Sequence, residues 1–550
     1  MVKKILWISR IGYKCSYSYV SILLLSSFIK KYPQYDFHVF CIGIVHYESQ
    51  IPIIANNIGI SANNVNILKT EYFNNINNED IEWYNNYRLG IYDINTVINK
   101  VKPDLIICLE DDYCVKKIMA ILDDRQIPFI PYIAADRANF NIQFDAKNIW
   151  TMTEFGKQQF GSCNESANIQ VLSHIIDNKS YFPIADKIKL RNKWVGSTYN
   201  SSFIVGSFNA NHVRKRWDIL IESFCQFAAK HHDAVLMIKT NVDKKINGIG
   251  IIPSHNYDMS ILIKDACTRY SINLDRIIIF DMDCTNFDLN ELYNCCDIGL
   301  YTTSGEGFGL TPCEMALCQI PSIVPNFSSF PEIFGSDSNL LIPTHTYSEK
   351  IGRYYQHKPT YYDPDKTLTN LYECICKSYV SHETKNINVV KLMITEDIDT
   401  IILSANGKNE IQKDYQPNFL TVKIKLLQHF QTIEFLITYL QNNILPHRLQ
   451  ILISNDINYM EQQYRYLYEL KTMINQLDKR INYFIDKEDI SLLPTVKIPH
   501  VSDVIKKLDE FYYNRNLIKK EGIKSKNIIS EKYNSDIIVD QFKKLIDWVG

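Results

Sequence analysis

The stretch LYNCCDIGLYTTSGEGFGLTPCE, residues Leu292–Glu314, carries the strongest structural signal in this sequence. Three glycines alternate within it, Gly305, Gly307 and Gly309, although the whole chain of 550 residues has only 19 glycines. Glycine lets a backbone adopt positive φ angles and approach a ligand closely. Successive amide groups in such a loop form a site for anions. We therefore predict that a phosphate group rests on Phe308–Pro312.

This loop joins a predicted strand, Asp297–Thr302, to a predicted helix, Thr311–Leu317. Thr311 as the N-cap, Pro312 at the first helical position and Glu314 at the third would form a capping box. The helix N-terminus would add its dipole to the anion site. Glu314 is then either a ligand-binding group or only the capping carboxylate, a role that contributes about 1 kcal/mol.

The sequence on both sides of the motif alternates apolar runs with helical stretches. Continuous Val/Ile/Leu-rich runs separated by helices indicate parallel sheets that are covered on both faces. The first series predicts strands at Lys4–Ser9, Phe37–Ile44, Asp104–Glu110, Phe129–Ile133, Ile149–Thr153 and Ile169–Leu172. The second predicts strands at Phe203–Phe208, Ala234–Lys239, Arg276–Asp281, Asp297–Thr302 and Pro321–Val324, with a helix at Arg214–Lys230.

We expect an α/β fold in which two Rossmann-like, doubly wound domains face a cleft, with a C-terminal α/β insertion. The expected domains are residues 1–190, residues 200–385, an inserted segment 386–498 of unknown role, and terminal helices in 499–550 that return to the first domain. The polar stretch Tyr181–Asn200 is the expected linker. Ligands of such sheets bind at the carboxyl ends of the strands.

Composition excludes several classes of protein. Hydrophobic residues make up 46% and charged residues 22%, and the net charge of −2 rules out a strongly basic nucleic-acid binder. Abundant Asn, Ile and Lys are typical of AT-rich coding sequence. The 14 cysteines show no zinc-knuckle spacing, which favours reduced thiols and a cytoplasmic protein. No apolar run is long enough for a transmembrane helix, while peripheral contact with a membrane stays open.

The motif resembles the donor site of retaining GT-B glycosyltransferases of family 4. The resemblance lies in Glu306-x7-Glu314 within GEGFGL, and in further segments that follow the family's order. These are a glycine loop at Gly12 and Tyr13 after the first strand, Trp150–Lys157 (WTMTEFGK), Val171–Asp177 (VLSHIID) and Arg214–Phe224 (RKRWDILIESF). It covers roughly residues 1–345 and the terminal helix.

The resemblance implies a metal-independent enzyme without a cofactor, which moves a sugar from a nucleotide-diphosphate sugar to an unidentified acceptor. Glu306, the implied catalytic residue, would contact the donor sugar, and Glu314 would bind the ribose. Lys215 and Arg214 would pair with the diphosphate. The implied donor-binding residues are Arg214, Lys215, Gly305, Gly307, Phe308, Gly309, Leu310, Thr311 and Glu314, and candidate cleft residues are Gly12, Tyr13, Asp136 and His174.

Departures from the family pattern leave interpretations open in which these residues have no ligand-binding role. The family places an arginine five residues before the lysine, where this chain has Ala210, and the glycine after His174 is replaced by Ile175. The basic residues at Arg214 could be a solvated turn, His174 a loop histidine and Asp136 a surface residue. Ala210 favours a second hypothesis, a nucleotide-sugar-binding scaffold protein with weakened catalysis.

A third hypothesis rests on the apolar run Ile277–Phe280, which precedes Asp281 and Asp283. A strand followed by D-x-D-x-T resembles the nucleophile motif of haloacid-dehalogenase phosphatases, in which one Asp attacks phosphorus and Mg²⁺ is bound. The same pair could be the metal-binding D-x-D of GT-A transferases. In the GT-B interpretation both carboxylates face solvent.

Overall fold

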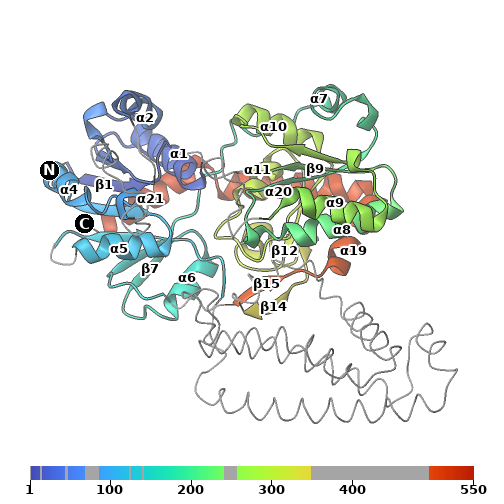
Figure 1. Ribbon diagram of the computed structural model, residues 1–550. Helices are drawn as coiled ribbons and strands as arrows, with labels where there is room; N and C mark the ends of the chain where they lie inside the picture. The colour runs from blue at the N-terminus through green and yellow to red at the C-terminus, as the bar shows by residue number, and fades with distance from the viewer. Residues whose placement is uncertain are drawn as a thin grey trace, which may run out of the picture. The chain divides into compact units, whose positions relative to one another are not determined.

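The structure is a computed structural model (Figure 1). It describes residues 2–12, 15–43, 47–68, 86–122, 126–138, 142–240, 257–348 and 495–549. The chain divides into two compact units, residues 1–346 with 494–550, and residues 347–493. The predicted segment 386–498 therefore lies almost entirely outside the described residues, as does Tyr13.

A parallel sheet of seven strands, in the order β3-β2-β1-β4-β5-β6-β7, forms the first half of the described unit. Its strands are β1 (Lys4–Ser9), β2 (Asp36–Cys41), β3 (Val65–Ile67), β4 (Leu105–Leu109), β5 (Phe129–Tyr132), β6 (Asn148–Thr151) and β7 (Asn168–Val171). Its helices are α1 (Ser16–Lys31), α2 (Ile51–Ile58), α4 (Ile94–Val101), α5 (Asp112–Leu122) and α6 (Glu154–Gly161).

A second parallel sheet of six strands has the order β10-β9-β8-β11-β12-β13. Its strands are β8 (Phe203–Phe208), β9 (Ala234–Lys239), β10 (Ile277–Phe280), β11 (Ile298–Leu300), β12 (Ser322–Pro325) and β13 (Leu341–Ile342). The helices are α7 (Lys187–Trp194), α8 (Trp217–Lys230), α9 (Met259–Tyr270), α10 (Asn286–Cys295), α11 (Leu310–Leu317) and α12 (Phe330–Phe334). Two further strands, β14 (His345–Ser348) and β15 (Thr495–Ile498), pair with each other.

Both sheets are doubly wound because helices cover their two faces. Every residue of β4, with the sequence LIICL, is buried, as is every residue of β8. The strand order reverses between β1 and β4 in the first sheet, and between β8 and β11 in the second. Ligands of doubly wound folds bind at such reversal points, next to the carboxyl ends of the strands. The predicted α/β fold with two Rossmann-like domains, the domain composition of GT-B proteins, is confirmed.

Three C-terminal helices return to elements of both halves. They are α19 (Val501–Tyr513), α20 (Arg515–Lys532) and α21 (Ser535–Val549), which contact α8, α11 and α1 respectively. Phe542 of α21 is fully buried, and its ring lies within 5.9 Å, between centroids, of Trp7, Phe28 and Trp150. The prediction that the terminal helices pack on the first domain is thus correct for α21 (Figure 1).

We expect Phe542→Ala to destabilise the first half strongly. Removing a buried aromatic ring costs about 3–5 kcal/mol, from lost burial and from the cavity that remains. The free energy of unfolding from chemical denaturation measures this loss. Trp548→Ala on the same helix is the matched control, because its side chain is 58% exposed and its removal should change the free energy by less than about 1 kcal/mol. Equal losses in the two variants would contradict the packing of α21.

Local details differ from the prediction in places. The predicted linker Tyr181–Asn200 does connect the two sheets, but it also contains α7, which packs on α10 because Arg191 donates to the Cys295 carbonyl oxygen at 3.0 Å and pairs with Asp297. The edge strand β3 was not predicted, because its three residues are too few to show a strand pattern. The helix expected from Arg214 begins only at Trp217.

Candidate functional site

Two loops meet at the reversal point of the second sheet, one after β8 and one after β11. The Arg214 carbonyl oxygen accepts hydrogen bonds from the Ser304 amide at 2.8 Å and from the Thr303 hydroxyl at 3.0 Å. The Thr302 hydroxyl donates to the Arg216 carbonyl oxygen at 2.9 Å. The threonines and serine of the TTSGEG sequence therefore fix the basic loop against the glycine loop.

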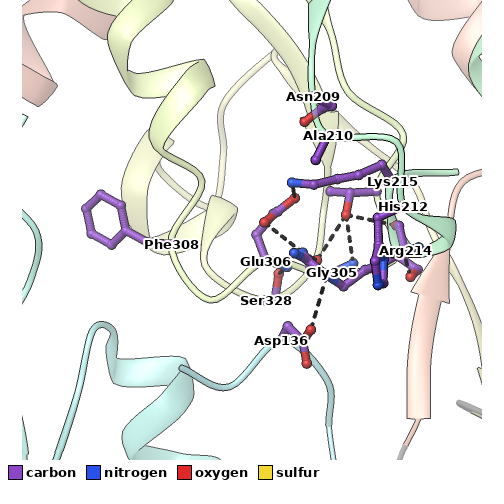
Figure 2. A network of polar contacts seen from close by, with 12 residues as sticks. Asp136, Asn209, Ala210, His212, Arg214, Lys215, Gly305, Glu306, Phe308 and Ser328 are labelled. Carbon is purple, nitrogen blue, oxygen red and sulfur yellow. Dashed lines mark hydrogen bonds and ion pairs between the residues drawn. The ribbon is translucent and has the colours of Figure 1, made fainter. Parts of the chain in front are cut away.

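Glu306 lies between two cations at this junction. Its side chain is buried and pairs with Lys215 through one carboxylate oxygen and with Arg214 through the other, the latter at 2.7 Å. Burial alone would raise the pKa of Glu306, but the two cations lower it to about 2. Figure 2 shows the carboxylate directed toward both side chains. Glu306 is therefore a fixed, ionised hydrogen-bond acceptor at neutral pH.

The basic residues reach this position because they precede α8 rather than form its first turn. Val213–Lys215 is a 3-10 turn that follows His212, whose ring nitrogen accepts the Arg214 amide hydrogen at 3.1 Å. Arg216 then has a left-handed φ of 53°, which separates the turn from the helix. As a result, the Arg214 and Lys215 side chains point to the glycine loop, as the donor-site prediction requires and the solvated-turn alternative does not.

Gly305 occupies a position that no side chain fits. Its φ is 152°, and a Cβ atom there would lie 1.7 Å from the Asp136 carbonyl oxygen. The Asp136 carboxylate lies 3.3 Å from Arg214, whose guanidinium also donates to the Gly305 carbonyl oxygen. Asp136, predicted only as a cleft candidate, therefore belongs to the same polar network as Glu306 (Figure 2).

The predicted capping box is wrong. Helix α11 begins at Leu310, and its N-cap is Gly309, which has a φ of 97° and makes no side-chain cap. Thr311 and Pro312 are consequently the second and third helical residues. The amides of Leu310 and Thr311 belong to the first turn, where helix N–H groups have no partner within the helix. The helix thus begins two residues earlier than the predicted capping box placed it, and its first-turn amides directly follow the glycine loop.

Glu314 lies inside α11 and is not a cap. The Tyr293 hydroxyl donates to its carboxylate at 2.7 Å. Burial raises the pKa of Glu314 to about 7, although hydrogen bonds from Tyr293 and Tyr181 favour the charged form. Its capping alternative is thus excluded, and its role toward a ribose stays a prediction.

The remaining predicted residues differ in how closely they relate to this network. Gly12 donates its amide hydrogen to the Ser18 hydroxyl at 3.0 Å. His174 is buried, which lowers its pKa to about 3 and keeps it neutral, and its ring lies 5.0 Å from that of Phe308. The Phe308 side chain points away from Glu306, so Phe308 would serve a ligand through its backbone (Figure 2). Gly307 packs against Ala134, where a Cβ atom would lie only 2.5 Å from the Ala134 Cβ.

Ser328 is a member of the network that sequence reasoning missed. Its hydroxyl accepts the Glu306 amide hydrogen at 2.9 Å, from a loop after β12 with a left-handed φ of 54°. No motif marks this serine, because its place depends on β12 lying beside β11 in the sheet.

The rival D-x-D site has a different environment. Asp281 and Asp283 are exposed, and they follow β10, the edge strand of the sheet. Among the residues that the structure describes, no group of three or more His, Cys, Asp or Glu side chains is placed to hold a metal ion. Within the same ranges, no helix combines the length and apolar character needed to cross a membrane.

The fold and site thus define an α/β protein with a glycine loop and a helix start at the reversal point of its second sheet. No family model matches the sequence. Parts of it are similar to the serotype-specific mannosyltransferase WbdA of Escherichia coli, with 26% identity over 163 residues, which are 27% of this chain and 19% of that protein. Another WbdA sequence is 35% identical over 123 residues, which are 20% of this chain and 15% of that protein. The chain therefore spans less than a fifth of these curated relatives.

Solved structures show weaker likeness. Anabaena Alr3699/HepE, in complex with UDP-glucose, has a TM-score of 0.43 and 15% identity, covering 60% of this chain and 82% of that one. Sucrose-phosphate synthase from Thermosynechococcus elongatus has a TM-score of 0.44 and 13% identity, covering 62% and 86%.

Proposed function

We propose that this chain is a glycosyltransferase that moves a sugar from a nucleotide-diphosphate sugar to a hydroxyl group of an acceptor. The observation that carries the proposal is the buried Glu306 carboxylate, held between Arg214 and Lys215 beside a glycine loop and a helix start. Similarity to mannosyltransferases supports it and makes nucleotide-activated mannose the first donor to test. In this proposal residues 200–385 bind the donor and residues 1–190 the acceptor.

Charge balance indicates how the donor would bind. Arg214 and Lys215 are balanced by Glu306 and Asp136, so the four side chains have no net charge. Burial lowers the pKa of Lys215, although Glu306 opposes this. A diphosphate at the start of α11 would gain the dipole, equivalent to about half a positive charge, and the amides of the loop. It would compete with Glu306 for Lys215 and leave the carboxylate to accept hydrogen bonds from the donor sugar.

The chemistry that suits this site needs positioning and positive charge rather than a protein nucleophile. We propose retention of configuration, with the acceptor oxygen attacking the anomeric carbon on the face that the diphosphate leaves. The acceptor's proton would pass to the departing phosphate oxygen. Arg214, Lys215 and the loop amides would stabilise the charge that develops on that phosphate.

Transfer assayed with purified protein, with and without EDTA, tests this function. We expect transfer from a nucleotide sugar at a rate that EDTA does not change, because side chains and amides supply the positive charge. Phosphate release that requires Mg²⁺ would instead support the phosphatase hypothesis. Donor binding without any transfer or hydrolysis would support the scaffold hypothesis that Ala210 suggests.

A further inference from the structure

A second polar cluster lies at the reversal point of the first sheet, after β1 and β4. It consists of Arg10, Tyr17, Glu110 and Asp111, here named the Asp111 cluster. Arg10 pairs with Glu110 at 2.8 Å and with Asp111 at 3.0 Å. The Tyr17 hydroxyl donates to the other oxygen of Asp111 at 2.7 Å. Both oxygens of the Asp111 carboxylate are thus fixed, one by Arg10, which follows β1, and the other by Tyr17 of α1.

The two carboxylates differ in exposure. The Asp111 side chain is 42% exposed, whereas that of Glu110 is fully buried. One Glu110 oxygen holds Arg10 and accepts the Asp111 amide hydrogen, which places this carboxylate within the cluster. Its other oxygen is buried and has no hydrogen-bond partner among the described residues. Buried polar atoms are normally paired, so this oxygen has hydrogen-bonding capacity that no described residue uses.

The Asp111 cluster adjoins the network around Glu306. Burial alone would lower the pKa of Arg214, but nearby carboxylates and also Tyr17 raise it, so Tyr17 lies within electrostatic reach of Arg214. Tyr17 in turn holds Asp111. Asp136, which contacts Arg214, links the same two regions through Arg137 and Asp112.

The charge of this region determines which chemical groups a ligand can bring to it. Arg10 and Arg137 face the carboxyl groups of Glu110, Asp111 and Asp112, whereas Asp136 is already balanced by Arg214. Excess negative charge repels phosphate and carboxylate groups, whereas a fixed carboxylate accepts hydrogen bonds from sugar hydroxyls. An exposed aspartate whose two oxygens already have protein partners is suited to binding a sugar hydroxyl, because little side-chain entropy remains to be lost on binding.

We propose that Asp111 binds the acceptor, and that this acceptor is a neutral sugar whose hydroxyls donate to the Asp111 carboxylate. The proposal rests on the proposed function, since it assigns the acceptor site of that reaction. Arg10 and Tyr17 position Asp111, and the charge of Arg10 is already paired with Glu110 and Asp111.

Sugar binding to the full chain, measured by calorimetry with saturating nucleoside diphosphate, tests the proposal directly. The probes are the methyl α-glycosides of mannose, glucose and galactose, with mannose 6-phosphate as the anionic comparison. We expect Asp111→Asn to weaken binding of the preferred glycoside about tenfold or more, as for loss of a charge-assisted hydrogen bond. Tyr17→Phe, which frees Asp111 to rotate, should weaken it by a smaller factor.

Asp104→Asn is the matched control. Asp104 is exposed and immediately precedes β4, whereas Asp111 follows the opposite end of the same strand. It should bind the glycoside like the unmodified protein. Equal affinity in the Asp111 and Asp104 variants, absence of glycoside binding, or tighter binding of mannose 6-phosphate would each overturn the proposal. Nucleoside diphosphate binding should be unchanged in all variants. Its absence throughout would instead count against the proposed function.

Discussion

Replacing Glu306 with glutamine is expected to lower sugar transfer by at least about a hundredfold, the scale seen when one preorganised electrostatic contact to a transition state is removed. Arg214 and Lys215 hold the pKa of this carboxyl at about 2, against the opposing effect of burial, so the native group is ionised at any assay pH. Glutamine keeps its size but presents one oxygen instead of two. The single oxygen of glutamine cannot accept hydrogen bonds from the two cations and from the donor sugar at the same time.

The Glu306→Gln change should preserve the fold and increase the thermal stabilisation that nucleoside diphosphate provides. Arg214 keeps its contacts with Asp136 and with the Gly305 carbonyl oxygen. Lys215 loses its carboxylate partner and stays buried, which is costly for a charge. A bound diphosphate would replace the missing negative charge. We therefore expect the ligand to raise the melting temperature of Glu306→Gln more than that of the unmodified protein.

Glu291→Gln provides the control for loss of an ion pair made by a buried glutamate. Glu291 pairs with Lys193 on α7 and accepts from the Trp194 indole at 2.8 Å, and it lies outside the Glu306 network. This variant should lose stability without losing transfer. Unchanged transfer by Glu306→Gln, with the fold intact by circular dichroism, would refute the site assignment.

Replacing Gly305 with alanine is expected to reduce both activity and stability, because the added methyl group meets backbone rather than a flexible side chain. The new Cβ would lie 1.7 Å from the Asp136 carbonyl oxygen, so one of the two loops must move. Movement would break the contacts of Arg214 with Asp136 and with residue 305. We expect transfer to fall about tenfold or more, as when positioning at a reacting centre shifts by about an ångström.

Gly59→Ala separates this clash from simple backbone strain. Gly59 also has a left-handed φ, of 84°, but no atom lies within 4 Å of the position that its Cβ would occupy. The strain alone costs about 1 kcal/mol and should leave transfer unchanged. If Gly305→Ala lost no more stability than Gly59→Ala and kept full activity, the close approach at Asp136 would be wrong.

Strands were predictable from sequence where every residue is buried. Continuous apolar stretches such as LIICL in β4 and FIVGSF in β8 are typical of central strands in a parallel sheet that is covered on both faces. The glycine loop was predictable for a related reason, since Gly305 and Gly309 both adopt positive φ angles. The family resemblance predicted Glu306 and Lys215 as site residues, but their pairing with each other was not predicted.

Other features depend on backbone conformation or strand order, which local sequence does not encode. Thr311 and Glu314 fit a capping box, but the left-handed Gly309 starts α11 before either can act as a cap. The left-handed Arg216 similarly separates Lys215 from α8, although the residues read as one continuous helix. Asp111 belongs to no recognisable sequence motif, because its partner Arg10 lies next to it only when β1 pairs with β4.

The most direct test of the donor site is thermal unfolding of the full chain with nucleoside diphosphates and nucleotide sugars. A ligand at a hundred times its dissociation constant stabilises the folded state by about 2.7 kcal/mol. We predict that one nucleoside diphosphate raises the melting temperature in a saturable way, whereas inorganic phosphate at the same concentration does not. No increase with any nucleotide at millimolar concentration would contradict the assignment of Arg214, Lys215 and the glycine loop as a nucleotide-sugar site.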